Sequence, residues 1–242
     1  MVVAAVRERP PRQRVGVTYE FELGGDGFLT VTELADGRPG ELFVTWAKQG
    51  STLQGLCDAL AISVSLGLQY GVPLGEYTRR LTGIRFEPAG ATSDPQVPQA
   101  TSLVDYLFRR IALDYLAAAG RAPTTPVAAV RERPPRQRVG VTYEFELGGD
   151  GFLTVTELAD GRPGELFVTW AKQGSTLQGL CDALAISVSL GLQYGVPLGE
   201  YTRRLTGIRF EPAGATSDPQ VPQATSLVDY LFRRIVLHTE DG

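Results

Sequence analysis

Hydrophobic and polar residues alternate with a period of two in three short segments near the N-terminus. These segments are residues 15–23, 28–34 and 42–46, and this period is typical of strands with one buried face. The glycine-rich sequence GGDG at 24–27 and the sequence ADGRPG at 35–40 separate them and predict turns. GGDG is followed by a strand pattern and not by a helix, so a hairpin is favoured over a phosphate-binding loop. The pattern predicts a three-stranded antiparallel sheet.

The hydrophobic spacing changes to steps of three and four residues between positions 50 and 71. Ser51 and Gln54 form a capping-box pair at the start, and Gly71 is suited to end the helix in the left-handed conformation. This long helix is apolar around most of its circumference. Polar residues such as Asp58 interrupt it, which favours a buried core helix over a membrane span.

Two more helices are predicted, a short one over 73–82 and another that opens at Thr101 or Ser102. Residues 84–98 between them are rich in Pro, Gly and Ala and predict a loop. The expected fold class is therefore α+β, with a three-stranded antiparallel sheet packed against, and covered by, a long central helix, plus two further helices.

The dominant feature of the chain is an internal repeat. Residues 3–111 and 127–235 are identical in sequence at a constant offset of 124. A period of this length predicts two identical domains, each with its own core. The expected divisions are 1–119 for the first domain (arm 3–14, core 15–119), 120–138 for the linker and second arm, and 139–242 for the second domain. The two domains could dock or stay apart.

Composition and charge add modest constraints. The 242 residues are 43% hydrophobic and 21% charged, which is typical of a globular protein, and the net charge is −4. We see no signal peptide or membrane helix and expect a cytoplasmic location with no membrane partner. Cys57 and Cys181 occupy the same position in the two central helices and are interpreted as core residues, since nothing demands a disulfide between them.

Each copy begins with the arm VRERPPRQR, whose paired prolines predict an extended segment. It carries the best basic patch in the chain, so its arginines are candidate contacts for a partner or a phosphate group. The arm lacks interleaved aromatic residues and contains a glutamate, so nucleic-acid binding is the less favoured interpretation. The candidate residues are Arg7, Arg9, Arg12, Arg14, Arg131, Arg133, Arg136 and Arg138.

Taken together, the sequences AKQGST, LQYGVPL, RFEPAG and VDYLFRR give each copy a close resemblance to a known family. Each repeat resembles the C-terminal TSCPD domain of adenosylcobalamin-dependent (class II) ribonucleotide reductases. The resemblance implies a cobalamin cofactor for a parent or partner reductase, but none for this chain.

This sequence departs from the family where short stand-alone relatives carry cysteines. The corresponding residues here are Ser51, Phe86 and Asp94, so one thiol per copy cannot supply a structural zinc site and no metal is expected. The one histidine, His238, is interpreted as a solvated terminal residue and not as a catalytic base. No catalytic or cofactor-binding residue is predicted, and the isolated chain is not expected to be an enzyme.

Three functional hypotheses remain. The first is a non-catalytic accessory module of a class II ribonucleotide reductase, acting in deoxyribonucleotide synthesis through contacts with the catalytic domain. The second is a self-association module in which the two copies form an intramolecular pseudo-dimer, helped by a tethered concentration of roughly millimolar. The third is weak binding of single-stranded nucleic acid through the arginine-rich arms.

Overall fold

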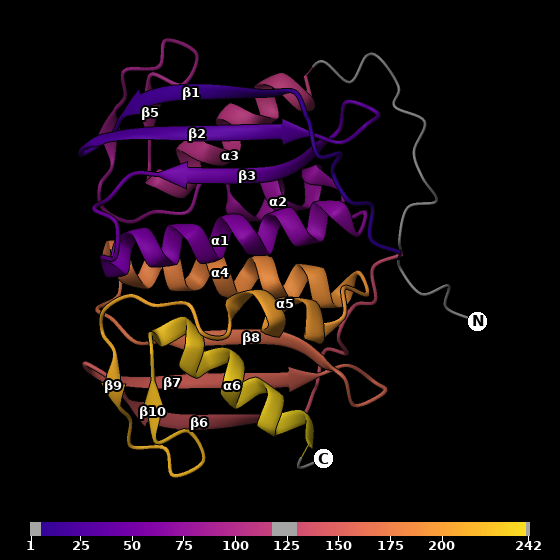
Figure 1. The fold of residues 1–242 in the computed structure, drawn as a ribbon, viewed down its shortest axis with the longest axis vertical. Coiled ribbons are helices and arrows are strands. Elements are labelled where there is room, and N and C mark those ends of the chain that lie inside the picture. The colour runs from indigo at the N-terminus through magenta and orange to yellow at the C-terminus, as the bar shows by residue number, and fades with distance from the viewer. Residues whose placement is uncertain (1–5, 118–129, 241–242) are drawn as a thin grey trace.

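The computed structural model describes residues 6–117 and 130–240, and it gives the two copies the same order of elements (Figure 1). The first copy contains β1 (Gly16–Glu22), β2 (Asp26–Glu33), β3 (Pro39–Thr45), α1 (Thr52–Gln69), α2 (Leu74–Leu81), β4 (Gly90–Ala91), β5 (Gln99–Ala100) and α3 (Leu103–Tyr115). The second contains β6 (Gly140–Glu146), β7 (Asp150–Glu157), β8 (Pro163–Thr169), α4 (Thr176–Gln193), α5 (Leu198–Leu205), β9 (Gly214–Ala215), β10 (Gln223–Ala224) and α6 (Leu227–Glu240). The α+β class and the two similar domains are confirmed.

The three predicted strands form an antiparallel sheet in the order β1-β2-β3. Tyr19 pairs with Leu29, which in turn pairs with Val44, so the alternating apolar side chains share one face. The burial of this face begins later than the alternation predicts. Val15 and Val17 are 72% and 42% exposed, and Tyr19 is the first partly buried residue of β1.

The central helix α1 has the predicted ends. The Ser51 hydroxyl accepts a hydrogen bond from the Gln54 backbone N–H at 3.3 Å, and Gly71 adopts a left-handed φ of +86° after the last turn. Only this half of the capping box forms. The Gln54 side chain does not return to the backbone of Ser51 but turns toward the sheet.

Helix α1 lies along the edge strand β3 (Figure 1), and its polar residues bond to the free backbone groups of that edge. The Gln54 side chain donates to the Val44 carbonyl at 2.7 Å, and the Gln69 side chain donates to the Gly40 carbonyl at 2.9 Å. The Ser65 hydroxyl accepts from the Leu42 N–H at 2.9 Å. These residues interrupt the apolar run because they satisfy an otherwise unpaired strand edge.

The inner face of the sheet is covered by α3. Phe21 of β1 packs on Tyr106 of α3 with ring centroids 4.5 Å apart, and the Arg110 guanidinium lies 4.6 Å above the Tyr19 ring. Ser102 caps α3, and its hydroxyl accepts a hydrogen bond from the Asp105 N–H at 3.1 Å. Ser102 is one of the two predicted starting residues of this helix. The sheet is therefore packed against both α1, at its edge, and α3, on its face.

The predicted loop over 84–98 contains one short element that the sequence did not indicate. Gly90–Ala91 and Gln99–Ala100 pair as a two-residue antiparallel ladder. Val97 is fully buried, and Phe86 is buried as well, so the apolar residues anchor the loop as expected.

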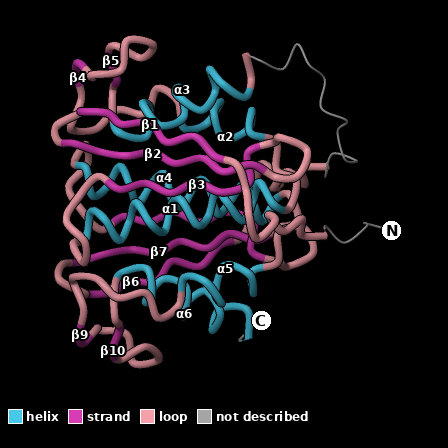
Figure 2. The backbone as a smooth tube through the Cα atoms, turned by 45° about the horizontal axis from the view of Figure 1, so that its top comes forward, coloured by secondary structure: helices cyan, strands magenta, loops and turns pink. Residues whose placement is uncertain are grey.

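The layers of the second copy follow in the reverse order of those of the first. Helices α1 and α4 lie side by side at the centre, and the two sheets lie outside them (Figures 1 and 2). The buried side chains form one cluster that includes residues of both copies, so the two predicted cores are joined. Helix α3 ends at Tyr115, and residues 120–129 of the predicted linker lie outside the described residues. Within the described ranges, no helix has the length and apolar character needed to cross a membrane.

Candidate interaction surface between the two copies

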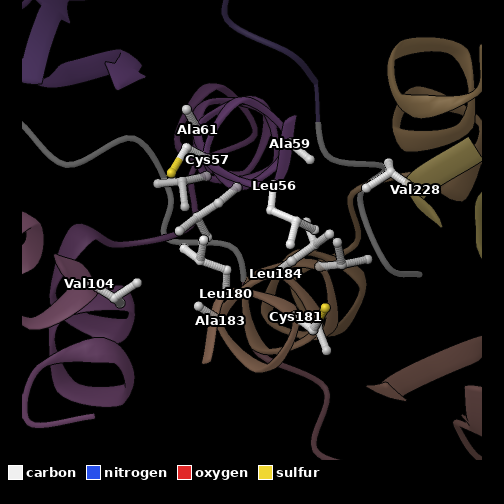
Figure 3. Packing of buried hydrophobic residues seen from close by; sticks show 14 of the residues in the cluster. Leu56, Cys57, Ala59, Ala61, Val104, Leu180, Cys181, Ala183, Leu184 and Val228 are labelled. Carbon is white, nitrogen blue, oxygen red and sulfur yellow. The ribbon is translucent and has the colours of Figure 1, made fainter. Parts of the chain in front are cut away.

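The contact between the copies is built on two identical helices. Leu56 of α1 and Leu180 and Leu184 of α4 are buried between the helix axes (Figure 3). Ala59 and its counterpart Ala183 are fully buried as well. Helices with leucine and alanine on the facing sides can approach closely and bury apolar surface, which is the main source of association free energy.

Each copy inserts one aromatic ring into the helix of the other. Phe86, from the first copy, lies over Gly179 of α4, and Phe210, from the second, lies over Gly55 of α1. A Cβ atom placed on either glycine would lie 2.1 Å from Cδ1 of the facing ring. The glycines therefore provide the space that the rings occupy.

Polar contacts follow the same reciprocal pattern. The Thr176 hydroxyl donates to the Glu87 carbonyl of the other copy, and the Thr52 hydroxyl donates to the Glu211 carbonyl. Contacts in which residue i meets j and the equivalent of j meets the equivalent of i define an isologous, pseudo-twofold interface.

The middle of the interface contains buried hydroxyl groups. Ser63 of α1 and its exact counterpart Ser187 of α4 are fully buried and hydrogen-bonded to each other. Two residues at the same position can meet in this way only on the pseudo-twofold axis. Tyr77 and Tyr201 are also fully buried, and burial raises the pKa of both phenols well above the usual value of 10.0.

The arms cross from one copy to the other. Arg7 donates to the Gln69 side chain of its own copy at 2.8 Å and forms an ion pair with Glu200 of the second copy at 2.7 Å. Arg131 makes the equivalent contacts with Gln193 at 2.8 Å and with Glu76 at 3.0 Å.

The other predicted arm residues have different surroundings. Arg14 pairs with Glu41 at 2.7 Å and Arg138 pairs with Glu165 at 2.5 Å, both within one copy. The exposed remainder consists of Arg9, Arg12, Arg133 and Arg136. The structure therefore uses four of the eight candidate arginines in ion pairs, and the hypothesis of nucleic-acid binding stays a prediction that salt-dependent binding of single strands would test.

Sequence reasoning did not identify the residues that join the copies. The sequence pattern places Gly55 and Ser63 in the long helix and Phe86 in the loop. The one available signal is a glycine inside the helix together with an apolar loop residue, since the glycine leaves a notch, a space on the helix surface, that an aromatic ring can fill. The three positions that correspond to cysteines in relatives have structural roles here. Ser51 caps α1, Phe86 fills the notch at Gly179, and Asp94 accepts a hydrogen bond from the Tyr106 hydroxyl at 3.1 Å.

The cysteines are free and buried. They lie on opposite flanks of the α1–α4 pair (Figure 3). Burial, with a smaller contribution from Asp58, raises the pKa of the Cys57 thiol to about 12, and Cys181 is raised to about 12 in the same way. Among residues 6–117 and 130–240, no group of three His, Cys, Asp or Glu side chains is placed to hold a metal ion.

The prediction of a solvated His238 is wrong. This residue is only 9% exposed, because α6 continues to Glu240 and places the ring against the sheet. Its Nδ1 atom is 2.8 Å from the Tyr143 hydroxyl, and its Nε2 atom is 3.5 Å from Glu157. In the first copy Asp114 takes the same place and accepts from the Tyr19 hydroxyl, so this position bonds to the equivalent tyrosine in both copies.

A groove runs along the side of the interface and is lined by both copies. Its floor is β8 and α4 of the second copy, and Arg80 and Ile84 of the first copy form part of its wall. Its volume is about 420 Å³. This volume is small for a corrin ring with its nucleotide tail.

The TSCPD domain family matches residues 4–115 and 124–239, which cover nearly the whole chain in two units. The chain belongs to this family, with one domain in each copy.

The relatives that the chain resembles are larger proteins. It is 45% identical over 159 residues to a vitamin B12-dependent ribonucleotide reductase of Streptomyces avermitilis, covering 65% of this chain and 16% of that protein. It is 40% identical over 203 residues to the vitamin B12-dependent ribonucleotide reductase of Streptomyces coelicolor, covering 80% of this chain and 20% of the relative. The one of Agrobacterium fabrum is 42% identical over 116 residues, covering 47% of this chain and 9% of that protein. The chain thus spans a fifth or less of the length of these relatives. No solved structure matches it.

Proposed function

We propose that this chain is a non-catalytic accessory module of a class II ribonucleotide reductase and acts through contacts with the catalytic part. The observation that carries the proposal is the similarity to a small part of several vitamin B12-dependent ribonucleotide reductases. The cofactor chemistry then belongs to the catalytic part. The role of this chain in deoxyribonucleotide synthesis is to bind and position that catalytic part.

The outer face of each sheet is the surface best suited to such a contact. Phe28 and Phe43 lie on neighbouring strands of this face and are 44% and 50% exposed, and the second copy repeats them as Phe152 and Phe167. Aromatic side chains are enriched at protein–protein interfaces relative to the rest of the surface. The pseudo-twofold arrangement presents two such faces.

Mixing the chain with a separately produced catalytic domain of a class II reductase tests the proposal. Sedimentation and reductase activity are measured with and without this chain. We expect a complex or a change in activity, and the variant with Phe28→Thr and Phe152→Thr should weaken it. The matched control is Val15→Thr with Val139→Thr, which removes exposed apolar groups outside this face. If the domain neither binds nor responds, the proposal fails.

A second candidate function is self-association of the two copies within one chain. The reciprocal placement of Phe86 and Phe210 supports it, as does the Ser63–Ser187 contact on the axis. Tethering raises the local concentration of the second copy to roughly millimolar, enough to close even a weak interface. Small-angle scattering decides the question, because one compact particle is expected and two separated particles would rule out the docked arrangement.

A further inference from the structure

The groove between the copies is lined in part by apolar side chains of both copies. Ile84 of the first copy and Phe167 and Ile186 of the second are among its lining residues. At about 420 Å³, the groove falls within the size range of small-molecule binding sites. It can hold a flat, ring-sized body but not a folded domain.

One end of the groove is positively charged. Arg80 and Arg131 line it, and Glu76 is shared between Arg131 at 3.0 Å and Arg79 at 2.5 Å. Within the part of the chain that the structure describes, Arg80 is exposed and has no hydrogen-bond or ion-pair partner. Burial lowers the pKa of Arg131, and repulsion from the Arg80 guanidinium adds to this effect, whereas Glu76 opposes it.

The remaining charged groups of the groove are two acids. Glu165 is paired with Arg138 at 2.5 Å, so its charge is compensated. Asp182 is half-buried and accepts a hydrogen bond from the Gln178 side chain at 2.7 Å. Burial raises the pKa of Asp182, and a hydrogen-bond donor would stabilise this carboxylate.

We propose that the groove binds a small organic anion, with its phosphate or carboxylate group at Arg80 and Arg131, a flat apolar body against Ile84, Phe167 and Ile186, and a hydrogen-bond donor facing Asp182. Guanidinium groups recognise both phosphate and carboxylate through paired N–H donors. The site rests on the proposed docking of the copies, because residues of both copies line it.

The internal repeat implies a second site of the same kind. Arg7 pairs with Glu200 at 2.7 Å, and repulsion from Arg204 helps to lower the pKa of Arg7, as Arg80 does for Arg131. Arg204 is the counterpart of Arg80 and is exposed. We therefore expect two binding sites per chain.

Calorimetric titration of the full chain with adenosine monophosphate and with indole-3-acetate tests the proposal and separates a phosphate head group from a carboxylate. Adenosine serves as the probe that lacks the anionic group, and inorganic phosphate serves as the probe that lacks the flat ring body. We expect at least one of the two anions to bind with a stoichiometry of two, and adenosine or phosphate alone to bind about tenfold more weakly or worse.

Arginine variants locate the site. Arg80→Ala should reduce the stoichiometry from two to one, and adding Arg204→Ala should abolish binding. The matched control, Arg12→Ala with Arg136→Ala, removes the same charge from exposed arm residues and should leave both sites intact. Arg80 is exposed, so its loss should not affect folding.

Scattering of the same sample separates this proposal from the docking on which it rests. A compact particle that binds neither anion at millimolar concentration overturns the groove proposal alone. Unchanged binding by the Arg80→Ala, Arg204→Ala variant also overturns it. Two separated particles overturn the docking and the groove together.

Discussion

Methyl groups added at Gly55 and Gly179 would test the docking of the copies most directly. A Cβ atom on Gly55 would lie 2.1 Å from Cδ1 and 2.3 Å from Cγ of Phe210, and Gly179 faces Phe86 with the same distances. Because the Cγ atom itself is too close, rotation of the ring cannot relieve the overlap. Either the ring leaves its notch or the helices separate.

The free energy of docking that this variant is expected to lose exceeds the helix stability that it gains. Alanine is about 0.5–1 kcal/mol more favourable than glycine inside a helix. Removing a buried phenylalanine side chain from its contacts costs about 3–5 kcal/mol. The difference is on the order of 2–4 kcal/mol for each notch, so the double variant should weaken docking severely even though each helix becomes intrinsically more stable.

Urea unfolding followed by circular dichroism measures this effect. The slope of unfolding free energy against urea scales with the surface exposed in one cooperative transition. Docked copies that share one core should unfold as a single unit, whereas two independent copies should each show roughly half the slope. We expect a lower midpoint, a lower slope, or both for the Gly55→Ala, Gly179→Ala variant.

The matched control is Gly75→Ala with Gly199→Ala. These glycines lie in α2 and α5, where an added Cβ would meet no atom within 4 Å, so stability should stay the same or rise. Equal or greater stability of the Gly55→Ala, Gly179→Ala variant, with the slope of the wild type, would refute the reasoning.

Three further predictions concern buried groups. The double-mutant cycle of Ser63→Ala and Ser187→Ala should give a coupling energy of about 0.5–1.5 kcal/mol in urea unfolding, and additive effects would contradict the axial contact. Because burial raises the pKa of Cys57 and Cys181 from 9.0 to about 12, the folded state favours the neutral thiols; this contribution to stability is fully present below pH 9 and is lost as pH rises toward 12. A disulfide reagent at pH 8 should therefore label them only after unfolding, and rapid labelling of the native chain would count against their burial. Gln54→Ala should lower the free energy of unfolding by about 1–3 kcal/mol, since it leaves backbone groups at the end of β3 unpaired, and thermal melts showing no change would disprove this role.

The elements of the fold could be predicted because their signals are local. The alternation along β1 to β3, the cap at Ser51 and the glycine at 71 each act within a few residues, and the structure contains all of them. The failures come from competition between local and distant partners. The Gln54 side chain could have closed the capping box, but the unpaired edge of β3 offers it more hydrogen bonds.

The candidate site was much less predictable. The arm arginines were identified, but the ion pair between Arg7 and Glu200 depends on residues 193 positions apart. The sequence position of His238 predicts a solvated side chain, but α6 extends to Glu240 and places this side chain against the sheet. Neither outcome has a signal in the neighbouring sequence.

The sequence by itself determined the two identical units, the elements of each unit and the family to which the chain belongs, because repetition, periodicity and capping are written in consecutive residues. Only the tertiary structure decided that Phe86 fills a notch at Gly179, that Ser63 meets Ser187, and that both copies line one groove. A buried apolar residue has no intrinsic preference for its own domain over a copy with the same surface. Which surface it packs against depends on the shape and the free energy of the assembled helices, and these exist only in three dimensions.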